Sequence, residues 1–177
     1  MNKKIEKGLL VGGLCMMVLC GCSLKEKEKC KEQVTAFLSS YQAKDKTSGK
    51  YLSDNKEGEV MVFEGFQAIL AEPIKFEIKS VEVNKDYNIV NVVITNVDFG
   101  VVFEGLVNSD DLHIDTTEEI MDELEKRLQA KDAPMHEYEI AVKLDKEQKI
   151  EMTSELSNAL LGGYTQYIYE LTEGGLQ

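Results

Sequence analysis

The chain has 177 residues, and its 20 basic side chains are outnumbered by 32 acidic ones, which gives a formal net charge of −12. This acidity, with Arg127 as the single arginine, argues against a nucleic-acid-binding protein, because phosphate contacts require clustered lysine and arginine side chains. The length suits one domain with a single hydrophobic core.

The N-terminus has the pattern of a secretory signal peptide. Residues 1–7 carry three lysines and one glutamate, and the following residues, Gly8 to Leu24, are uncharged and mostly apolar. A short basic segment followed by a short apolar one is typical of a secretory signal. A membrane-spanning helix needs about 20 apolar residues, so we do not expect this run to span a membrane permanently.

The end of the apolar run, Leu19-Cys20-Gly21-Cys22, resembles the lipobox of bacterial lipoprotein precursors. The resemblance implies cleavage between Gly21 and Cys22 and a diacylglyceryl thioether on the Cys22 sulfur. Two acyl chains anchor a protein stably, whereas one binds only marginally. We therefore expect a protein held by lipid on the extracytoplasmic face of the cell membrane. The alternative is an ordinary signal peptide with incidental cysteines.

This reading divides the chain into a removed signal peptide (1–21), a lipidated tether (22–30) and a single folded domain (31–177). Of the four cysteines, only Cys30 then remains free, which excludes an intramolecular disulfide and cysteine-based metal sites. We expect Cys30 to pack as a small apolar residue, with a reactive thiol as the alternative.

In the first half of the domain, the sequence pattern predicts two helices and two strands. An apolar stripe from Cys30 to Tyr41 indicates a helix, and a second stripe from Val60 to Leu70 ends before Pro73. Alternation from Ile74 to Val83 indicates a strand, with a phase shift at Lys79-Ser80 that predicts a bulge. The run Ile89–Val97 is β-branched at nearly every position, so we expect a central strand buried on both faces.

The second half mixes helices and strands. A short helix is expected over Val101–Val107, and Thr116 with Glu119 forms a capping box that opens the next helix, with Ile120, Leu124 and Leu128 as its apolar stripe. We expect this helix, or else a partner protein, to cover the second face of the central strand. Tyr138–Leu144 and Ile150–Met152 predict a third and a fourth strand. A last helix from Leu156 ends on a glycine cap at Gly162-Gly163, and the pattern does not place Tyr164 to Leu171.

The order of elements predicts an α+β fold in which N-terminal helices pack on a curved antiparallel sheet of about four strands, with helical insertions. From Val34 to Gly163 the chain resembles small, uncharacterised lipoproteins of Gram-positive bacteria with a cystatin-like or nuclear-transport-factor-2-like cone. The N-terminal helix and the segments Phe76–Glu104 and Glu137–Gly163 carry this resemblance. It implies a fold and a location, and it implies no reaction.

No sequence pattern predicts a catalytic centre, a metal site or a cofactor. His113 and His136 stand apart from any recognisable acid–base or zinc motif, and nucleophile-elbow, P-loop and dinucleotide motifs are absent. The acidic residues Asp110, Asp111 and Asp115 lack the spacing of a calcium loop.

We therefore expect a non-catalytic module that binds a peptide, a protein or an envelope component. Its possible binding surface is formed by Tyr164, Tyr167 and Tyr169, although tyrosines at this spacing also suit an element packed on the core. The alternative function is a hydrolase or isomerase that uses a cone-shaped cavity, which would require a titratable pair inside that cavity.

Overall fold

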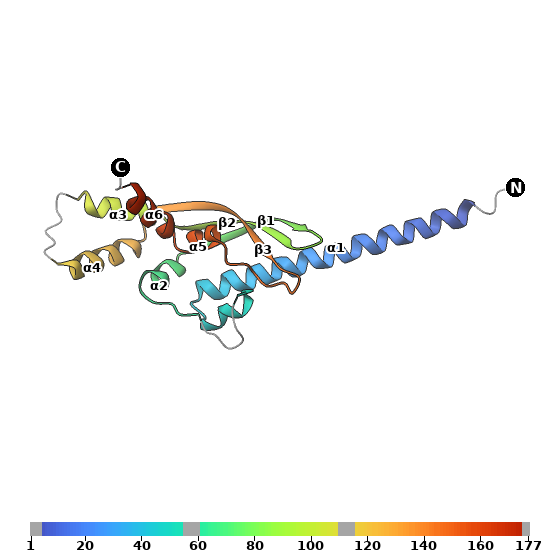
Figure 1. Ribbon diagram of the computed structural model, residues 1–177, viewed down its shortest axis with the longest axis horizontal. Helices are drawn as coiled ribbons and strands as arrows, with labels where there is room; N and C mark the ends of the chain where they lie inside the picture. Colours follow the sequence, from blue (N-terminus) through green and yellow to red (C-terminus); the bar gives the residue numbers. More distant parts are fainter. Residues whose placement is uncertain (1–4, 55–60, 110–115, 175–177) are drawn as a thin grey trace.

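The computed structural model describes residues 5–54, 61–109 and 116–174. Figure 1 shows helices grouped around one antiparallel sheet, which confirms the α+β class. In chain order the elements are α1 (Ile5–Gln42), the 3₁₀ helix η1 (Lys46–Tyr51), α2 (Gly65–Ala71), β1 (Lys75–Val83), β2 (Asn88–Val97), α3 (Phe99–Val107), α4 (Thr117–Leu128), β3 (Met135–Leu144), α5 (Ser154–Leu160) and α6 (Tyr164–Gly174).

Helix α1 is the longest element, and its first half projects away from the rest of the protein (Figure 1). The predicted stripe on its second half is confirmed, because Cys30, Val34, Phe37, Leu38 and Tyr41 are all at most 2% exposed. The side chains of residues 24–29 are exposed. Among the side chains described from Leu24 onward, the core therefore begins at Cys30.

Within the described residues the sheet has three strands in the order β1-β2-β3, and both pairings are antiparallel. The predicted bulge is confirmed, since the register of β1 against β2 shifts between Ile78 and Ser80.

The predicted fourth strand is wrong. Ile150 forms only isolated bridges, one to Leu144 and one to Leu52. The chain turns tightly before it, with Gln148 at φ 67°, and Thr153 then caps α5 by accepting a hydrogen bond from the Leu156 amide at 3.2 Å. The segment between the turn and this cap is too short for a further strand.

Burial on both faces of β2 is also wrong. Val90, Val92 and Ile94 are at most 1% exposed, on the face that meets α1 and α5. On the opposite face Ile89, Asn91, Val93 and Thr95 are only half-buried. Val93 lies between Glu77 of β1 and Glu139 of β3, whose charged groups favour water over a covering helix.

The predicted middle helix packs elsewhere. Leu124 and Leu128 of α4 join a second apolar cluster beyond the end of the sheet, with buried residues from α2, β2 and α3: Leu70, Val97, Phe99, Val102 and Leu106. The capping box at Thr116 and Glu119 is confirmed. Helix α2 begins at Gly65 rather than at Val60, which lies outside the described residues.

Helix α5 is joined to β2 by a buried asparagine and two glycines. Asn96 is fully buried, and its side-chain amide donates to the carbonyls of Ala159 (3.2 Å) and Leu160 (3.0 Å) at the end of α5. The predicted glycine cap is confirmed, with Gly162 and Gly163 at φ 58° and 82°. A Cβ on Gly162 would lie 2.2 Å from the Val97 carbonyl oxygen, so only glycine fits there.

Candidate functional site

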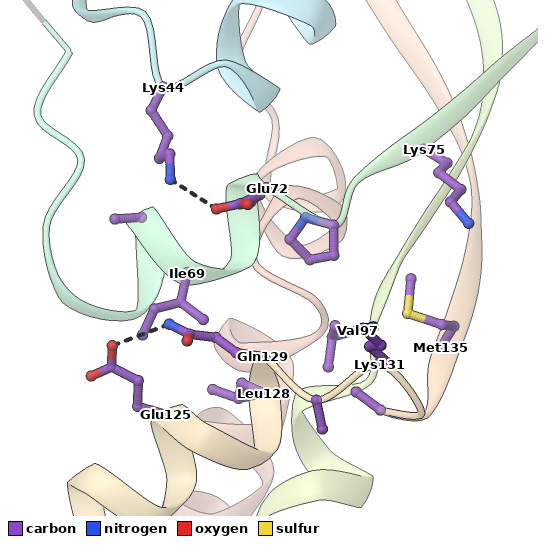
Figure 2. Close-up of a pocket in the computed structure, with 14 residues that line it drawn as sticks. Lys44, Ile69, Glu72, Lys75, Val97, Glu125, Leu128, Gln129, Lys131 and Met135 are labelled. Carbon is purple, nitrogen blue, oxygen red and sulfur yellow. Dashed lines mark hydrogen bonds and ion pairs between the residues drawn. The ribbon is translucent and has the colours of Figure 1, made fainter.

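A groove of about 690 Å³ lies between α2, the end of α4 and the first residues of β1 and β3. Figure 2 shows its lining side chains, which come from segments far apart in the sequence. In Figure 1 the elements that form it lie in the half of the protein away from the N-terminal end of α1. This is also the half that carries the second apolar cluster.

The floor of the groove is apolar. It is formed by Ala68 and Ile69 of α2, Pro73, Val97 at the end of β2, Leu128 of α4, Ala133 and Met135. Val97 and Leu128 are 1% and 2% exposed, whereas Met135 is 43% exposed. The floor is thus the outer surface of the second cluster, continued by one exposed methionine.

The rim is charged. The Lys44 ammonium lies 3.0 Å from a Glu72 carboxylate oxygen, and the Gln129 amide donates to Glu125 at 3.1 Å. Two further lysines, Lys75 at the start of β1 and Lys131 after α4, also line the groove. Within the described residues neither lysine has a carboxylate within 4.0 Å, the limit for an ion pair.

The helices beside the groove are fixed by local interactions. The Arg127 side chain donates to Glu123 one turn earlier (2.9 Å) and to the Gly105 carbonyl of α3 (2.9 Å), which holds the end of α4 against α3. The side chain of Gln42 donates to the carbonyl of Ile74 at 2.7 Å, which ties the end of α1 to the residue before β1. The groove walls therefore have defined positions.

The three tyrosines proposed as a binding surface lie on α6 and differ in exposure. Tyr164 and Tyr167 are half-buried and pack edge-on against Phe99, with ring centroids 4.9 and 6.0 Å away. Burial, with a smaller effect of Glu104, raises the pKa of Tyr167. Tyr169 is 58% exposed. The first two serve the core, and binding by this surface stays a prediction.

One histidine, His136, lies beside an acidic residue at the start of β3. Its Nδ1 is 3.8 Å from a carboxylate oxygen of Asp98, and its ring centroid is 4.7 Å from that of Tyr138. Burial, followed by the Asp98 charge, raises the pKa of Tyr138 to about 12. The described lining of the groove contains neither His136 nor Asp98. The pair therefore lies outside this cavity.

The remaining sequence candidates for metal binding or catalysis are not placed. Asp110, Asp111, His113 and Asp115 lie outside the described residues. In the described part of the chain no three His, Cys, Asp or Glu side chains gather as a metal ion would need.

The expected cleavage site and the buried cysteine both lie on α1. Gly21 and Cys22, which flank the expected cleavage site, belong to this helix. No described helix is long and apolar enough to cross a membrane. Cys30 is buried, and its thiol donates to the Gln148 side-chain oxygen at 3.1 Å. Burial, reinforced by the Glu26 charge, raises the pKa of the Cys30 thiol. Its packing role is confirmed, and these features oppose the reactive-thiol alternative.

The groove was not anticipated from the sequence. Lys131 follows α4, where a basic residue commonly interacts with the helix C-terminus, and Lys75 opens a strand. No pattern in the sequence joins these two lysines. Comparison of the chain with models of known protein families, with curated proteins and with solved structures finds no match.

Proposed function

We propose that this protein is a lipid-anchored lipoprotein on the extracytoplasmic face of the cell membrane, and that its folded part is a non-catalytic binding module. The anchoring rests on the segment Leu19-Cys20-Gly21-Cys22. The binding role rests on one observation, the groove with an apolar floor and a partly unpaired charged rim.

The structure around α1 supports the anchoring proposal. Residues 24–29 are exposed, and among the side chains that the structure describes, which begin at Leu24, Cys30 is the first that packs in the core. Cys22 lies eight residues before Cys30 on the same helix, which corresponds to about 12 Å at the helical rise. A lipid on Cys22 would thus hold the domain close to the membrane surface, with the groove in the half that points away from it.

For the domain itself we propose a cone-like arrangement related to the cystatin-like and nuclear-transport-factor-2-like lipoproteins of Gram-positive bacteria. Its support is the long helix α1, which packs on one face of an antiparallel sheet with α5 beside it. In this protein the sheet has three strands. The face packed on α1 and α5 is filled by apolar side chains, including Val90, Val92 and Ile94.

A binding role suits the groove better than catalysis. Its described lining offers lysine, glutamate and glutamine side chains but no histidine, cysteine or serine, so it lacks the usual nucleophile and imidazole base. Few convergent polar groups around an apolar floor are typical of ligand sites.

Replacement of Cys22 tests the anchor. Cys22→Ala should leave unprocessed precursor and abolish incorporation of labelled fatty acid, because the thiol that accepts the lipid is gone. Cys20→Ala is the matched control, since it keeps a small residue within the segment and should be lipidated normally. Mass spectrometry that finds an unlipidated mature N-terminus in the unaltered protein would contradict the proposal.

A photo-reactive side chain placed in the groove tests the binding role. With the benzophenone amino acid at Gln129, irradiation of intact cells should yield a covalent adduct of higher mass. The same group at Lys85, which is exposed in the turn between β1 and β2, should yield none. Equal labelling from both positions, or none from either, would contradict a binding role for the groove.

A further inference from the structure

We propose that the groove binds an acidic, amphipathic peptide segment of a partner protein. This inference rests on the proposed binding function and adds the chemistry of the ligand. In the proposed complex, aliphatic side chains of the segment cover Ile69 and Met135, and its carboxylates reach Lys75 and Lys131.

The charge distribution carries the first part of the argument. The chain as a whole has a net charge of −12, yet the described groove lining holds three lysines against two glutamates. Lys44 is already paired with Glu72, and Glu125 accepts from Gln129. The two lysines without such a partner in the described residues, Lys75 and Lys131, are therefore the groups that remain for carboxylates of a ligand.

The arrangement of the lining carries the second part. Figure 2 shows Lys75 and Lys131 on the side of the groove where Val97 and Met135 lie, and the Lys44–Glu72 pair and Ile69 on the other side. One side thus offers two lysines without a carboxylate partner in the described residues, beside apolar surface. The other side offers apolar surface beside the Lys44–Glu72 pair and Glu125, whose carboxylate accepts from a neutral amide and keeps its negative charge. A ligand that matches both sides is amphipathic, with its acidic groups gathered toward one end.

The form of the site favours a peptide segment. The groove is walled by two helices, α2 and α4, and it is partly open to the surface. Amphipathic segments commonly lay their apolar side chains into such grooves. Of the described apolar lining residues, Ile69 is partly buried and Met135 is 43% exposed, whereas Leu128 is fully buried beneath them. Ile69 and Met135 therefore offer the apolar area that aliphatic side chains can cover.

Peptides with one leucine pattern and three kinds of polar residue test the proposal. In one peptide all polar positions are glutamate, in the second glutamine and in the third lysine. Each carries a fluorophore and is titrated with the full chain in non-ionic detergent, with fluorescence anisotropy as the measurement. The acidic chain attracts the lysine peptide and repels the glutamate peptide through non-specific electrostatics. A preference for the glutamate peptide therefore requires a local positive site.

We expect the glutamate peptide to bind tightest. Charge reversal in Lys75→Glu/Lys131→Glu should weaken its binding by about tenfold or more at low salt. The matched control is Lys85→Glu/Lys146→Glu, which changes the net charge equally but alters exposed turn residues at the other end of the sheet. Its affinity for the glutamate peptide should stay within about twofold of the unaltered protein, because screening weakens distant charges.

Several outcomes would overturn the inference. These are no binding of the glutamate peptide at about 1 mM, equal affinity for all three peptides, or equal loss of binding in the groove and control variants. A second copy of this chain is the other candidate occupant, and a dimer in sedimentation that Lys75→Glu/Lys131→Glu dissociates would identify it instead. If the benzophenone at Gln129 forms an adduct while the peptides show no preference, the groove binds a ligand and only its proposed chemistry is wrong.

Discussion

Replacement of Asn96 by alanine should be among the most destabilising single changes in this domain. Asn96 has no exposed area, and its amide donates to two carbonyls at the end of α5 while its oxygen accepts from the Val97 amide at 2.8 Å. In Asn96→Ala the carbonyl of Ala159 keeps a second hydrogen-bond donor, the Gly162 amide. The carbonyl of Leu160 and the amide of Val97 lose their hydrogen bonds to the Asn96 side chain.

A buried polar group left without a partner costs about 1–3 kcal/mol. For these two groups together we expect Asn96→Ala to lower the free energy of unfolding by about 2–5 kcal/mol. Asn91 is the matched control, since it lies on the same strand but on the open face, where its amide donates to Ser80 and Glu82. Because water can replace those contacts, Asn91→Ala should cost about 1 kcal/mol or less.

Urea unfolding followed by circular dichroism measures both values. Equal costs for Asn96→Ala and Asn91→Ala would refute the reasoning, because the difference depends on burial alone. A third variant, Asn96→Asp, adds a pH test. Burial beside two carbonyl oxygens should raise the pKa of the new carboxyl group above its usual value of about 3.9.

A raised pKa in the folded state means that the folded protein holds a proton that the unfolded chain releases. Relative to the unaltered protein, the stability of Asn96→Asp should therefore be greatest below about pH 4 and should fall as the pH rises through the raised pKa. A cost relative to the unaltered protein that does not change between these pH values would show that position 96 is not buried as described.

Three further predictions concern the core. Gly162→Ala should lower the free energy of unfolding by more than about 2 kcal/mol or prevent folding, because the φ of 58° and the Val97 carbonyl oxygen, 2.2 Å from the new Cβ, exclude a side chain there. Gly105→Ala, whose Cβ would meet nothing within 4 Å, should be neutral or stabilising by up to about 1 kcal/mol. Equal thermal midpoints for the two variants would contradict this prediction. In urea unfolding, Ile94→Ala should lower the free energy of unfolding by about 2–5 kcal/mol and Val93→Ala by about 1 kcal/mol or less. Similar losses for the two variants would mean that both faces of β2 are buried after all. Because burial raises the pKa of the Cys30 thiol, this thiol should react with maleimide at pH 8 far more slowly in the folded protein than in urea. Peptide mass spectrometry measures the two rates, and fast labelling of the folded chain would contradict the packing of Cys30.

Local signals predicted most of the elements correctly. The capping box at Thr116, the bulge at Lys79-Ser80 and the glycine cap at Gly162 each depend on neighbouring residues, and each is present in the structure. Burial of the second face of β2 depended on what packs against the strand from elsewhere. The β-branched run is compatible with both outcomes, because such residues also favour a central strand with one open face. The polar residues Asn91 and Thr95 on that face were the signal of the open face.

The groove shows a different limit. Its described lining combines residues after α1, in α2, in β1, at the end of β2, in α4 and before β3. None of these segments carries a motif. Only the structure shows that Glu72 pairs with Lys44, so that Lys75 and Lys131 have no carboxylate partner in the described residues. A site assembled by packing alone leaves no spacing pattern in the chain.

The continuity of α1 has a consequence for the orientation of the domain. A flexible linker would leave the domain free to rotate about the proposed anchor at Cys22, whereas a helix that enters the core directly transmits rotation. Each residue added between Cys22 and Cys30 would turn the domain by about 100° around the axis of α1 and shift it by about 1.5 Å. Relative to the proposed anchor at Cys22, the azimuth of the groove around that axis is therefore set by the helical phase of residues 22–30, even though the exposed side chains of this segment, Leu24 to Lys29, make no core contacts.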